Sequence, residues 1–267
     1  MAEKAVIKAF EDGSAEFAEW APLLWDPVGA AVVDLVGPVP GERVLDVCCG
    51  AGSSAIPAAR AVGPNGLVDA VDLAAALLDQ GARRARELPQ LRFHRDDVTG
   101  WSAPDGLPYN HVQCVFGIFF LPDVDAAGVH LTHLLRPGGT LAVTTWRQGS
   151  VDDVVGPLFR ALAEHTGVAP TRPAAADRAA RLDTDDKLAE WMRSLGLDAV
   201  RVHPVELDVP ITPESAWAFV TGSAGRALLA GLDDRAVAAV RDRYRELVRP
   251  TAVLRVRALV GIGARPS

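Results

Sequence analysis

The chain has 267 residues, of which 49% are hydrophobic and 23% are charged, proportions that are ordinary for a soluble globular protein. This length suits one large α/β domain with an insertion and is too short for two independent enzymes. The net charge of −7 provides no electrostatic footprint for a phosphate backbone, so we expect neither nucleic acid nor a membrane as a partner.

The sequence contains no signal for export or membrane insertion. No apolar run approaches the roughly 18 residues of a transmembrane helix, and the charged residues among the first ten argue against a secretion signal. The three cysteines, Cys48, Cys49 and Cys114, fall at expected buried strand ends and are interpreted as reduced structural thiols. We therefore expect a cytoplasmic protein.

Hydrophobic residues recur at helical spacing over residues 5–35, interrupted by two prolines, which predicts two or three helices before the core. Phe17, Trp20, Leu24 and Trp25 form an aromatic and aliphatic group in this segment. In one interpretation these side chains only pack the helices onto a sheet. In the other, Trp20 and Trp25 also contact a ligand, and the residues favour the two equally.

Residues 41–72 predict a strand, a glycine turn, a helix, a second strand and an acid, in that order. The apolar run at 44–47 is typical of a central parallel strand. Gly50 and Gly52 then allow positive φ and a close approach of ligand to backbone, and the helix that follows points its first amides at that ligand. Asp72 ends the second strand about 20 residues later, where an acid accepts hydrogen bonds from ribose hydroxyls.

This turn does not fit a phosphate site. A phosphate-binding pattern needs further glycines where Cys48 and Ala55 stand, and no Gly-Lys-Ser/Thr follows. The remaining candidate ligand is a nucleoside whose other end is not a phosphate. Asp46, inside the first strand, suits a neighbouring ammonium group.

Helices and strands alternate beyond Asp72. The basic cluster at residues 83–86, at the end of the next helix, is interpreted as a solvated face that complements the helix dipole. No internal repeat is visible. The expected elements are a helix at 73–87, strands at 91–95, 112–116 and 140–145, helical excursions within 147–196 and 212–248, and strands at 200–209 and 254–262, the last antiparallel.

Five segments resemble, in order and spacing, the class I S-adenosylmethionine-dependent methyltransferases. Residues 44–52 resemble motif I, with Cys48 in place of its first glycine, and Asp72 resembles the ribose-binding acid. The resemblance continues at 95–98, 115–123 and 134–143 and covers roughly residues 40–147. It is strongest to small-molecule enzymes related to quinone biosynthesis, the methyltransferase family 11-like branch. The absence of Asn/Asp-Pro-Pro-Tyr/Phe after the fourth strand argues against branches that methylate nucleic acids or glutamine.

The resemblance implies an α/β fold with a Rossmann-like, seven-stranded, mostly parallel sheet and helices on both faces. An N-terminal helical lid and helical insertions after strands 5 and 6 complete it. We expect a single methyltransferase domain over residues 1–267, divided into a lid (1–40), a cofactor-binding core (41–147), acceptor-side insertions (148–196 and 212–248) and last strands (199–209 and 253–263).

The resemblance also implies the ligands and their residues. S-adenosyl-L-methionine is the cofactor and S-adenosyl-L-homocysteine the product. Asp97 would accept from the adenine amine, although a helix cap is the alternative for this acid. The acceptor would contact Trp20, Trp25, Trp146 and Trp217. The predicted cofactor-binding residues are Asp46, Cys48, Gly50, Gly52, Asp72, Leu73, Asp97, Val98, Phe116 and Gly117.

Methyl transfer by in-line displacement needs orientation and desolvation, with a base only where the nucleophile is protonated. Of the six histidines, His165 in the first excursion is the best candidate base, and the others are expected in structural or surface roles. No spacing predicts a metal site; His130 and His133 lack a third ligand.

The leading hypothesis is a methyltransferase of specialised metabolism acting on a small, largely apolar acceptor. The first alternative keeps fold and cofactor but catalyses a reaction without methyl transfer, as in pericyclase-like or decarboxylating relatives. The second is a non-catalytic subunit, disfavoured because the motif residues are intact. The acceptor, the methylated atom and the oligomeric state, a homodimer included, stay open.

Overall fold

The computed structural model describes residues 2–249 and 252–267, and within these ranges seven strands form one sheet. The strand order is β3-β2-β1-β4-β5-β7-β6. Neighbours among the first five strands are parallel, and β7 is antiparallel to both β5 and β6. The predicted fold class and the antiparallel last strand are confirmed. The strands are β1 (Arg43–Val47), β2 (Leu67–Asp72), β3 (Leu91–Arg95), β4 (Tyr109–Val115), β5 (Leu135–Trp146), β6 (Asp198–Ile211) and β7 (Ala252–Ala264).

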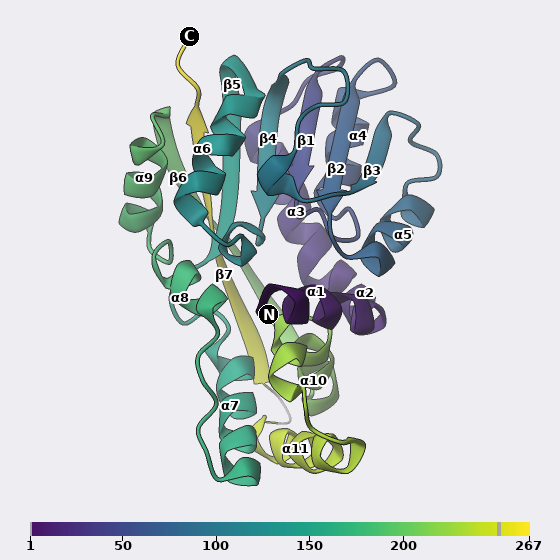
Figure 1. Ribbon diagram of the computed structural model, residues 1–267, viewed down its shortest axis with the longest axis vertical. Helices are drawn as coiled ribbons and strands as arrows, with labels where there is room; N and C mark the ends of the chain where they lie inside the picture. The colour runs from purple at the N-terminus through teal and green to yellow at the C-terminus, as the bar shows by residue number, and fades with distance from the viewer. Residues whose placement is uncertain (1, 250–251) are drawn as a thin grey trace.

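Helices cover both faces of this sheet and build a second lobe below it (Figure 1). Short 3₁₀ turns lie at Val98–Gly100, Ile118–Phe120 and Ala224–Leu229, and a π-helical turn lies at Ala21–Trp25. In the described part of the chain, no helix combines the length and apolar character needed to cross a bilayer. The helices are α1 (Ala2–Asp12), α2 (Ser14–Trp20), α3 (Asp26–Val36), α4 (Ala55–Val62), α5 (Ala75–Arg84), α6 (Val124–Leu134), α7 (Asp152–Thr166), α8 (Ala174–Ala180), α9 (Asp185–Ser194), α10 (Pro213–Thr221) and α11 (Asp234–Leu247).

One helix in each of the two excursions begins at a threonine that caps its first turn. The Thr184 side chain accepts from the Lys187 amide at the start of α9. Thr212 and Ser215 form a reciprocal capping box at α10, so two amides that the helix cannot satisfy itself are paired.

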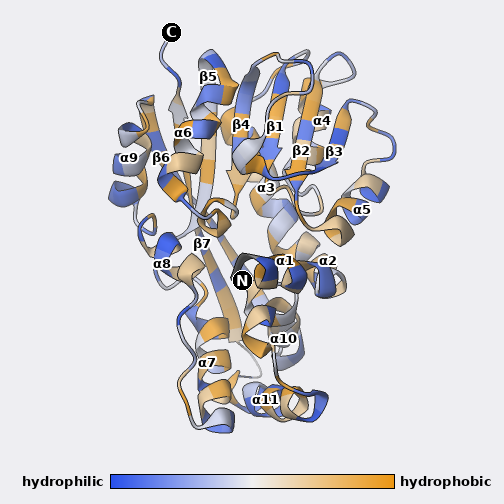
Figure 2. Cartoon of the chain, viewed as in Figure 1, coloured by the Kyte–Doolittle hydropathy of each residue, from blue (hydrophilic) through white to orange (hydrophobic). Residues whose placement is uncertain are grey.

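The middle of the sheet is buried on both faces, as a parallel sheet covered by helices requires. Val44, Leu45 and Val47 of β1 have no exposed surface, and the same is true of Val68 and Val71 of β2. Figure 2 shows the strands at the centre of the sheet in hydrophobic colours and α9, at its edge, in largely hydrophilic ones.

The long ribbon of β6 and β7 links the sheet to the lower lobe (Figure 1). This lobe contains α7, α10 and α11, and the Tyr244 hydroxyl of α11 donates to the Val154 carbonyl of α7 at 3.1 Å. Helices α1 and α2 lie between the two lobes (Figure 1). The carboxyl ends of β1, β4 and β5 therefore face the region between the two lobes, which we call the waist. Segments that are distant in the sequence cover this region.

The strands β4, β5, β6 and β7 all extend beyond the residues predicted for them, and the differences in β4 and β5 have a visible structural cause. β4 begins at Tyr109 and ends at Val115, one residue before the expected end, because Phe116 takes a φ of +56° that a strand cannot hold. β5 begins at Leu135 instead of residue 140: Tyr109 pairs with Leu135, and a register shift follows before His111 pairs with Thr140.

Candidate functional site

The turn after β1 runs through three residues with positive φ: Cys48 at +55°, Gly50 at +53° and Gly52 at +80°. Glycine accepts this conformation without strain, whereas cysteine does so at a cost. The Gly50 amide donates to Asp72 Oδ2 at 2.9 Å, which joins the turn to the carboxyl end of β2. The two parts of the predicted nucleoside site thus lie together.

Asp72 is held by backbone donors. Its Oδ1 accepts from the Ala74 amide at 2.9 Å while its Oδ2 accepts from Gly50. Burial nevertheless raises the pKa of this carboxyl above its ordinary value, against the lowering effect of these hydrogen bonds. The carbonyl of Leu73, the next residue, accepts a hydrogen bond from Arg95 Nε at 3.3 Å.

Asp46 lies beneath the turn with no exposed surface. Ser54 Oγ donates to its Oδ2 at 2.7 Å, whereas Oδ1 has no hydrogen-bond partner. Burial raises the pKa of Asp46 to about 7, against the lowering effects of the Ser54 hydroxyl and of the neighbouring Gln113 side chain, and with a further upward contribution from the negative Asp72. A buried carboxyl with one unpaired oxygen is chemically suited to meet a cation.

Asp97 acts as a cap in this structure. Its Oδ1 accepts from both the amide and the hydroxyl of Thr99, at 2.9 and 2.7 Å. The alternative role raised from the sequence is therefore present, and contact with an adenine amine stays a prediction for this exposed side chain. Val98, the other residue predicted there, is buried.

Phe116 and Gly117 follow β4 directly beside Cys48. A Cβ added to Gly117 would lie 2.4 Å from Cys48 Cβ and 3.0 Å from the sulfurs of Cys48 and Cys114. The side chain of Cys48 thus fills the space that a side chain at position 117 would need. Burial and the neighbouring Cys114 thiol raise the pKa of the Cys48 thiol, which keeps it protonated.

Five rings from four separate segments form an aromatic cluster at the waist: Phe17, Trp25, Phe116, Trp146 and Phe219. Trp25 stacks on Phe17 at 5.2 Å with an interplanar angle of 10°, and on Phe219 at 6.1 Å and 22°. Phe116 stacks on Trp146 at 3.9 Å and 17°. Trp25 meets this second pair edge-on, 6.0 Å from Phe116 and 6.3 Å from Trp146. The cluster offers flat apolar faces at the carboxyl ends of β4 and β5.

The four predicted acceptor-binding tryptophans occupy different positions. Trp25 and Trp146 belong to the aromatic cluster. Trp20 is 1% exposed, and its Nε1 donates to the Ser215 carbonyl at 2.9 Å, so it packs α2 against α10. Trp217 packs edge-on against Tyr244 at 5.3 Å, on the side of α10 that faces α11.

Phe219 belongs to the aromatic cluster although it was not among the predicted acceptor-binding residues, whereas Trp217 lies outside the cluster. Two residues span about 200° around a helix, so these two side chains lie on opposite sides of α10. The periodicity of α10 carried this information, but which side faces the waist depends on how α10 docks on α2.

The histidines lie outside the aromatic cluster. His165, the candidate base, is exposed in the last turn of α7 in the lower lobe (Figure 1), next to Glu164, which binds Arg243 of α11. The structure does not bring it to the waist, because α7 runs away from the sheet. The others are His94, bonded to Asp69; His111, bonded to Glu42; His130 and His133 on α6; and His203 on β6.

The N-terminal helices are fastened over the glycine turn. Phe17 Cζ lies 3.5 Å from where a Cβ of Gly50 would be, so the ring covers the turn. Arg84 of α5 donates to the Ala51 carbonyl at 3.0 Å and to Asp26, the first residue of α3, at 2.7 and 2.8 Å. Ser53 Oγ also donates to Asp26, at 2.6 Å. Phe17 was predicted from the sequence to pack the N-terminal helices onto the sheet, but its contact with the turn was not predicted.

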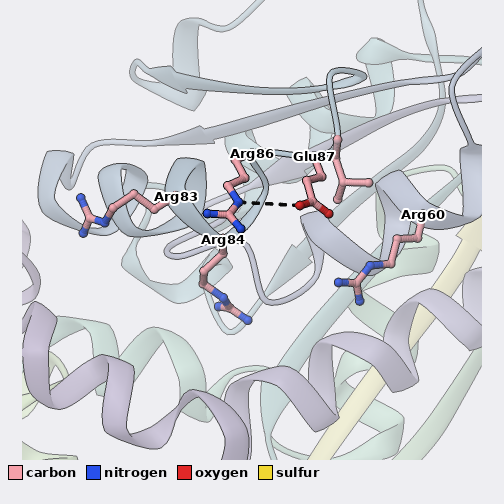
Figure 3. Close-up of a pocket in the computed structure, with 6 residues that line it drawn as sticks. Arg60, Arg83, Arg84, Arg86 and Glu87 are labelled. Atoms are coloured by element: carbon pink, nitrogen blue, oxygen red, sulfur yellow. Dashed lines mark ion pairs between the residues drawn. The ribbon is translucent and has the colours of Figure 1, made fainter.

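A surface hollow of about 330 Å³ lies beside α4 and α5 and is lined by Arg60, Arg83, Arg84, Arg86, Glu87 and Leu88. Figure 3 shows the guanidinium group of Arg83 turned away from those of the other three arginines, and Arg86 paired with Glu87. The labelled side chains are all exposed. This arrangement agrees with the solvated basic face predicted for the end of α5.

No group of three or more metal-binding side chains occurs among the residues that the structure describes. The three cysteines are free thiols.

Comparison with known proteins gives a consistent result. A family model described as a methyltransferase domain matches residues 44–139. Aklanonic acid methyltransferase DauC from Streptomyces sp. strain C5 is 33% identical over 60% of this chain and 68% of its own length. Nocamycin O-methyltransferase from Saccharothrix syringae is 31% identical over 73% of this chain and 72% of its own length. In fold, the chain is similar to YcgJ from Bacillus subtilis, with a TM-score of 0.57, 16% identity and coverage of 90% of this chain and 99% of that one.

Proposed function

We propose that this chain, which belongs to the class I S-adenosylmethionine-dependent methyltransferases, methylates an acidic oxygen of a planar small molecule. Its membership makes it an enzyme that uses S-adenosylmethionine to methylate small-molecule acceptors in secondary metabolism. The acidic oxygen and the planar shape of the acceptor are our own proposal and go beyond the family membership. The observation that carries the proposal is the placement of the aromatic cluster directly above the glycine turn, through Phe17 and Gly50.

The residues of the turn fit the cofactor. Gly50 and Gly52 take the positive φ values that the turn requires, and Asp72 offers carboxylate oxygens at the end of β2. Asp46 Oδ1 has no partner and suits the ammonium of the methionyl part. We infer that these four residues hold the cofactor, with Asp72 at the ribose. When bound, S-adenosylmethionine supplies an electrophilic methyl group on a sulfonium, and its sulfur leaves as the thioether of S-adenosylhomocysteine.

The protein supplies orientation and exclusion of water. The stacked pair of Phe116 and Trp146 forms one apolar wall, and Trp25 with Phe219 forms another. Flat walls of this kind favour a planar conjugated acceptor, which gains dispersion and quadrupole contacts from stacking. Removing water from such a site strengthens the attraction between an anionic nucleophile and a cationic sulfonium.

An oxygen that ionises by itself suits a site whose walls are this aromatic cluster, because none of the five rings can take up a proton. Among the described residues the cluster contains only phenylalanine and tryptophan, and no histidine belongs to it. A phenol, enol or carboxylic acid can lose its proton to water before it binds, so the enzyme need not remove that proton. The similarity to nocamycin O-methyltransferase supports oxygen as the methylated atom.

Calorimetric titration of the purified protein with S-adenosylmethionine and S-adenosylhomocysteine tests the site. Asp72→Ala should weaken binding by about 1–3 kcal/mol, because it leaves buried polar groups unpaired. Asp233→Ala is the matched control: it also removes a carboxylate that binds a backbone amide, at the start of α11, and should leave binding unchanged. Failure of the folded wild-type protein to bind either ligand would overturn the assignment.

The chemistry is tested with planar acidic acceptors of graded pKa. If the acceptor arrives ionised, the pH at which kcat/KM reaches half its maximum should move with the pKa of the acceptor. A pH profile independent of the acceptor would point to a base on the enzyme. Release of S-adenosylhomocysteine in step with product separates methyl transfer from the alternative reactions that leave the cofactor intact.

A further inference from the structure

The ring of Phe17 contacts both the glycine turn and the indole of Trp25. Its edge lies over Gly50, with Cζ 3.5 Å from the position of a Cβ on that residue. Its face stacks on Trp25 at 5.2 Å and 10°. The ring therefore covers both the backbone turn where the cofactor is proposed to lie and one flat face of the aromatic cluster.

Trp25 is held differently from the structural tryptophan beside it. Trp20 is fixed by a hydrogen bond from Nε1 to the Ser215 carbonyl. Trp25 Nε1 is buried without a partner, so ring contacts alone hold its indole. Trp25 also ends a five-residue π-helical turn, a feature that occurs frequently at functional sites because it departs from regular helix packing.

We propose that Phe17 is a placeholder for both ligands and that Trp25 provides the face on which the acceptor stacks. The inference rests on the proposed function of the glycine turn. A ligand lying against Gly50 requires the Phe17 ring to leave, and the departure of the ring uncovers the face of Trp25. A planar conjugated acceptor then takes the stacking position that Phe17 held. The cofactor consequently binds first, and the acceptor site exists only after it has bound.

This arrangement gives Phe17 a defined energetic role. Cofactor binding must break the Phe17–Trp25 stack, so part of the binding free energy is spent on opening the lid. A stacked aromatic pair contributes enough that its loss corresponds to roughly 2–10-fold in affinity. Phe17→Ala should therefore bind S-adenosylhomocysteine about 2–10-fold more tightly than the wild type.

Phe17→Leu and Phe10→Leu serve as companions to this variant. Phe17→Leu keeps apolar bulk without a flat face and guards against a general loss of folding, which circular dichroism checks. Phe10 lies in the same lid and meets Phe17 and Phe120 edge-on, at 6.2 and 5.6 Å. Phe10→Leu removes only this edge-on contact with Phe17 and keeps the Phe17–Trp25 stack, so it should tighten S-adenosylhomocysteine binding by less than Phe17→Ala does.

The acceptor half is tested with 2-hydroxy-1,4-naphthoquinone as a planar acidic probe, measured by calorimetry with and without saturating S-adenosylhomocysteine. The wild type should bind the probe only in the presence of S-adenosylhomocysteine, whereas Phe17→Ala should bind it in both conditions. Trp25→Leu should lose probe binding and keep S-adenosylhomocysteine binding.

The results separate the two proposals. If no variant binds S-adenosylhomocysteine, the proposed function fails. If S-adenosylhomocysteine binds wild type and Phe17→Ala equally, or the probe binds the wild type equally in both conditions, the placeholder role of Phe17 is refuted. If the probe does not bind the wild type saturated with S-adenosylhomocysteine, or binds Trp25→Leu as well as the wild type, the stacking role of Trp25 is refuted.

Discussion

The side chain of Cys48 occupies the space that a side chain at position 117 would need. A double-mutant cycle can measure the coupling free energy between Cys48 and Gly117. Position 48 corresponds to a glycine in motif I, but here it carries a Cβ at a φ of +55°. Gly117 has a φ of −109°, which any residue can adopt, so the backbone at 117 does not require glycine. What excludes a side chain there is the 2.4 Å approach of its Cβ to Cys48 Cβ.

Gly117→Ala should therefore lower the free energy of unfolding by about 1–3 kcal/mol, the usual cost of overpacking a core. The clash outweighs the roughly 0.4–1 kcal/mol gained by restricting the unfolded chain. In a Cys48→Gly background the nearest obstacle is Cys114 Sγ at 3.0 Å, and the cost should shrink to under about 1 kcal/mol. Cys48→Gly alone exchanges about 1–2 kcal/mol of left-handed strain for a similar loss of chain entropy and packing, so it should be nearly neutral.

Urea denaturation of the four proteins gives the coupling free energy directly, from midpoints at a constant slope. We expect the two substitutions to couple by at least about 1 kcal/mol, in the direction of rescue. Gly100→Ala is the matched control, since a Cβ at this exposed glycine meets no heavy atom within 4 Å and should change stability by less than about 0.5 kcal/mol. Equal costs of Gly117→Ala in both backgrounds would refute the explanation.

Three further substitutions test other parts of the structure. Below pH 7, S-adenosylhomocysteine binding should weaken by up to about tenfold per pH unit, because a protonated Asp46 must lose its proton to face an ammonium. Calorimetry in two buffers should detect that proton, and an unchanged signal in Asp46→Asn would contradict the role. Without ligand, the protonated carboxyl favours the folded state below its ordinary pKa of 3.8, and this contribution disappears as the pH rises through about 7, which urea midpoints at several pH values can follow. Trp20→Phe should cost about 1–3 kcal/mol in unfolding free energy by leaving the Ser215 carbonyl unpaired; a loss below about 0.5 kcal/mol would show that water replaces the indole. Arg84→Gln should cost less than about 1 kcal/mol, and less still in high salt, because its ion pair with Asp26 is about one-third exposed; a larger cost that salt does not reduce would point to the carbonyl contact instead.

The fold of the proposed cofactor half was predictable because it is encoded locally. Residues 43–72 hold β1, the glycine turn, α4 and β2, and the Gly50–Asp72 hydrogen bond spans only 22 positions in the sequence. Alternating apolar periods and turn residues define such a unit without knowledge of the rest of the chain. The compensation between Cys48 and Gly117 was not predictable, since the sequence shows a lost glycine and an unrelated glycine 69 positions later.

The acceptor half was predicted less well because it depends on packing between distant segments. Phe17 reaches Gly50, and Phe219 reaches Trp25, only after α2 and α10 have docked against each other. Helical periodicity identifies the two sides of α10 but does not say which side will meet α2. For the same reason the sequence did not show that His165 lies in the lower lobe, away from the aromatic cluster, since the direction of α7 is fixed by its packing on α11.

The family match and the aromatic cluster involve largely different parts of the chain. The matched methyltransferase domain covers residues 44–139, and of the five rings in the aromatic cluster only Phe116 lies inside it. Trp146, Phe219 and the two lid residues lie outside. If the cofactor lies at the glycine turn as proposed, the segments that share the family pattern hold it, whereas most of the aromatic cluster comes from segments that the family pattern does not constrain. Substitutions at Trp146 and Phe219, which neither stack on Phe17 nor belong to the predicted cofactor site, should accordingly change which acceptors are methylated and leave the affinity for S-adenosylhomocysteine within about twofold, a difference of under 0.5 kcal/mol.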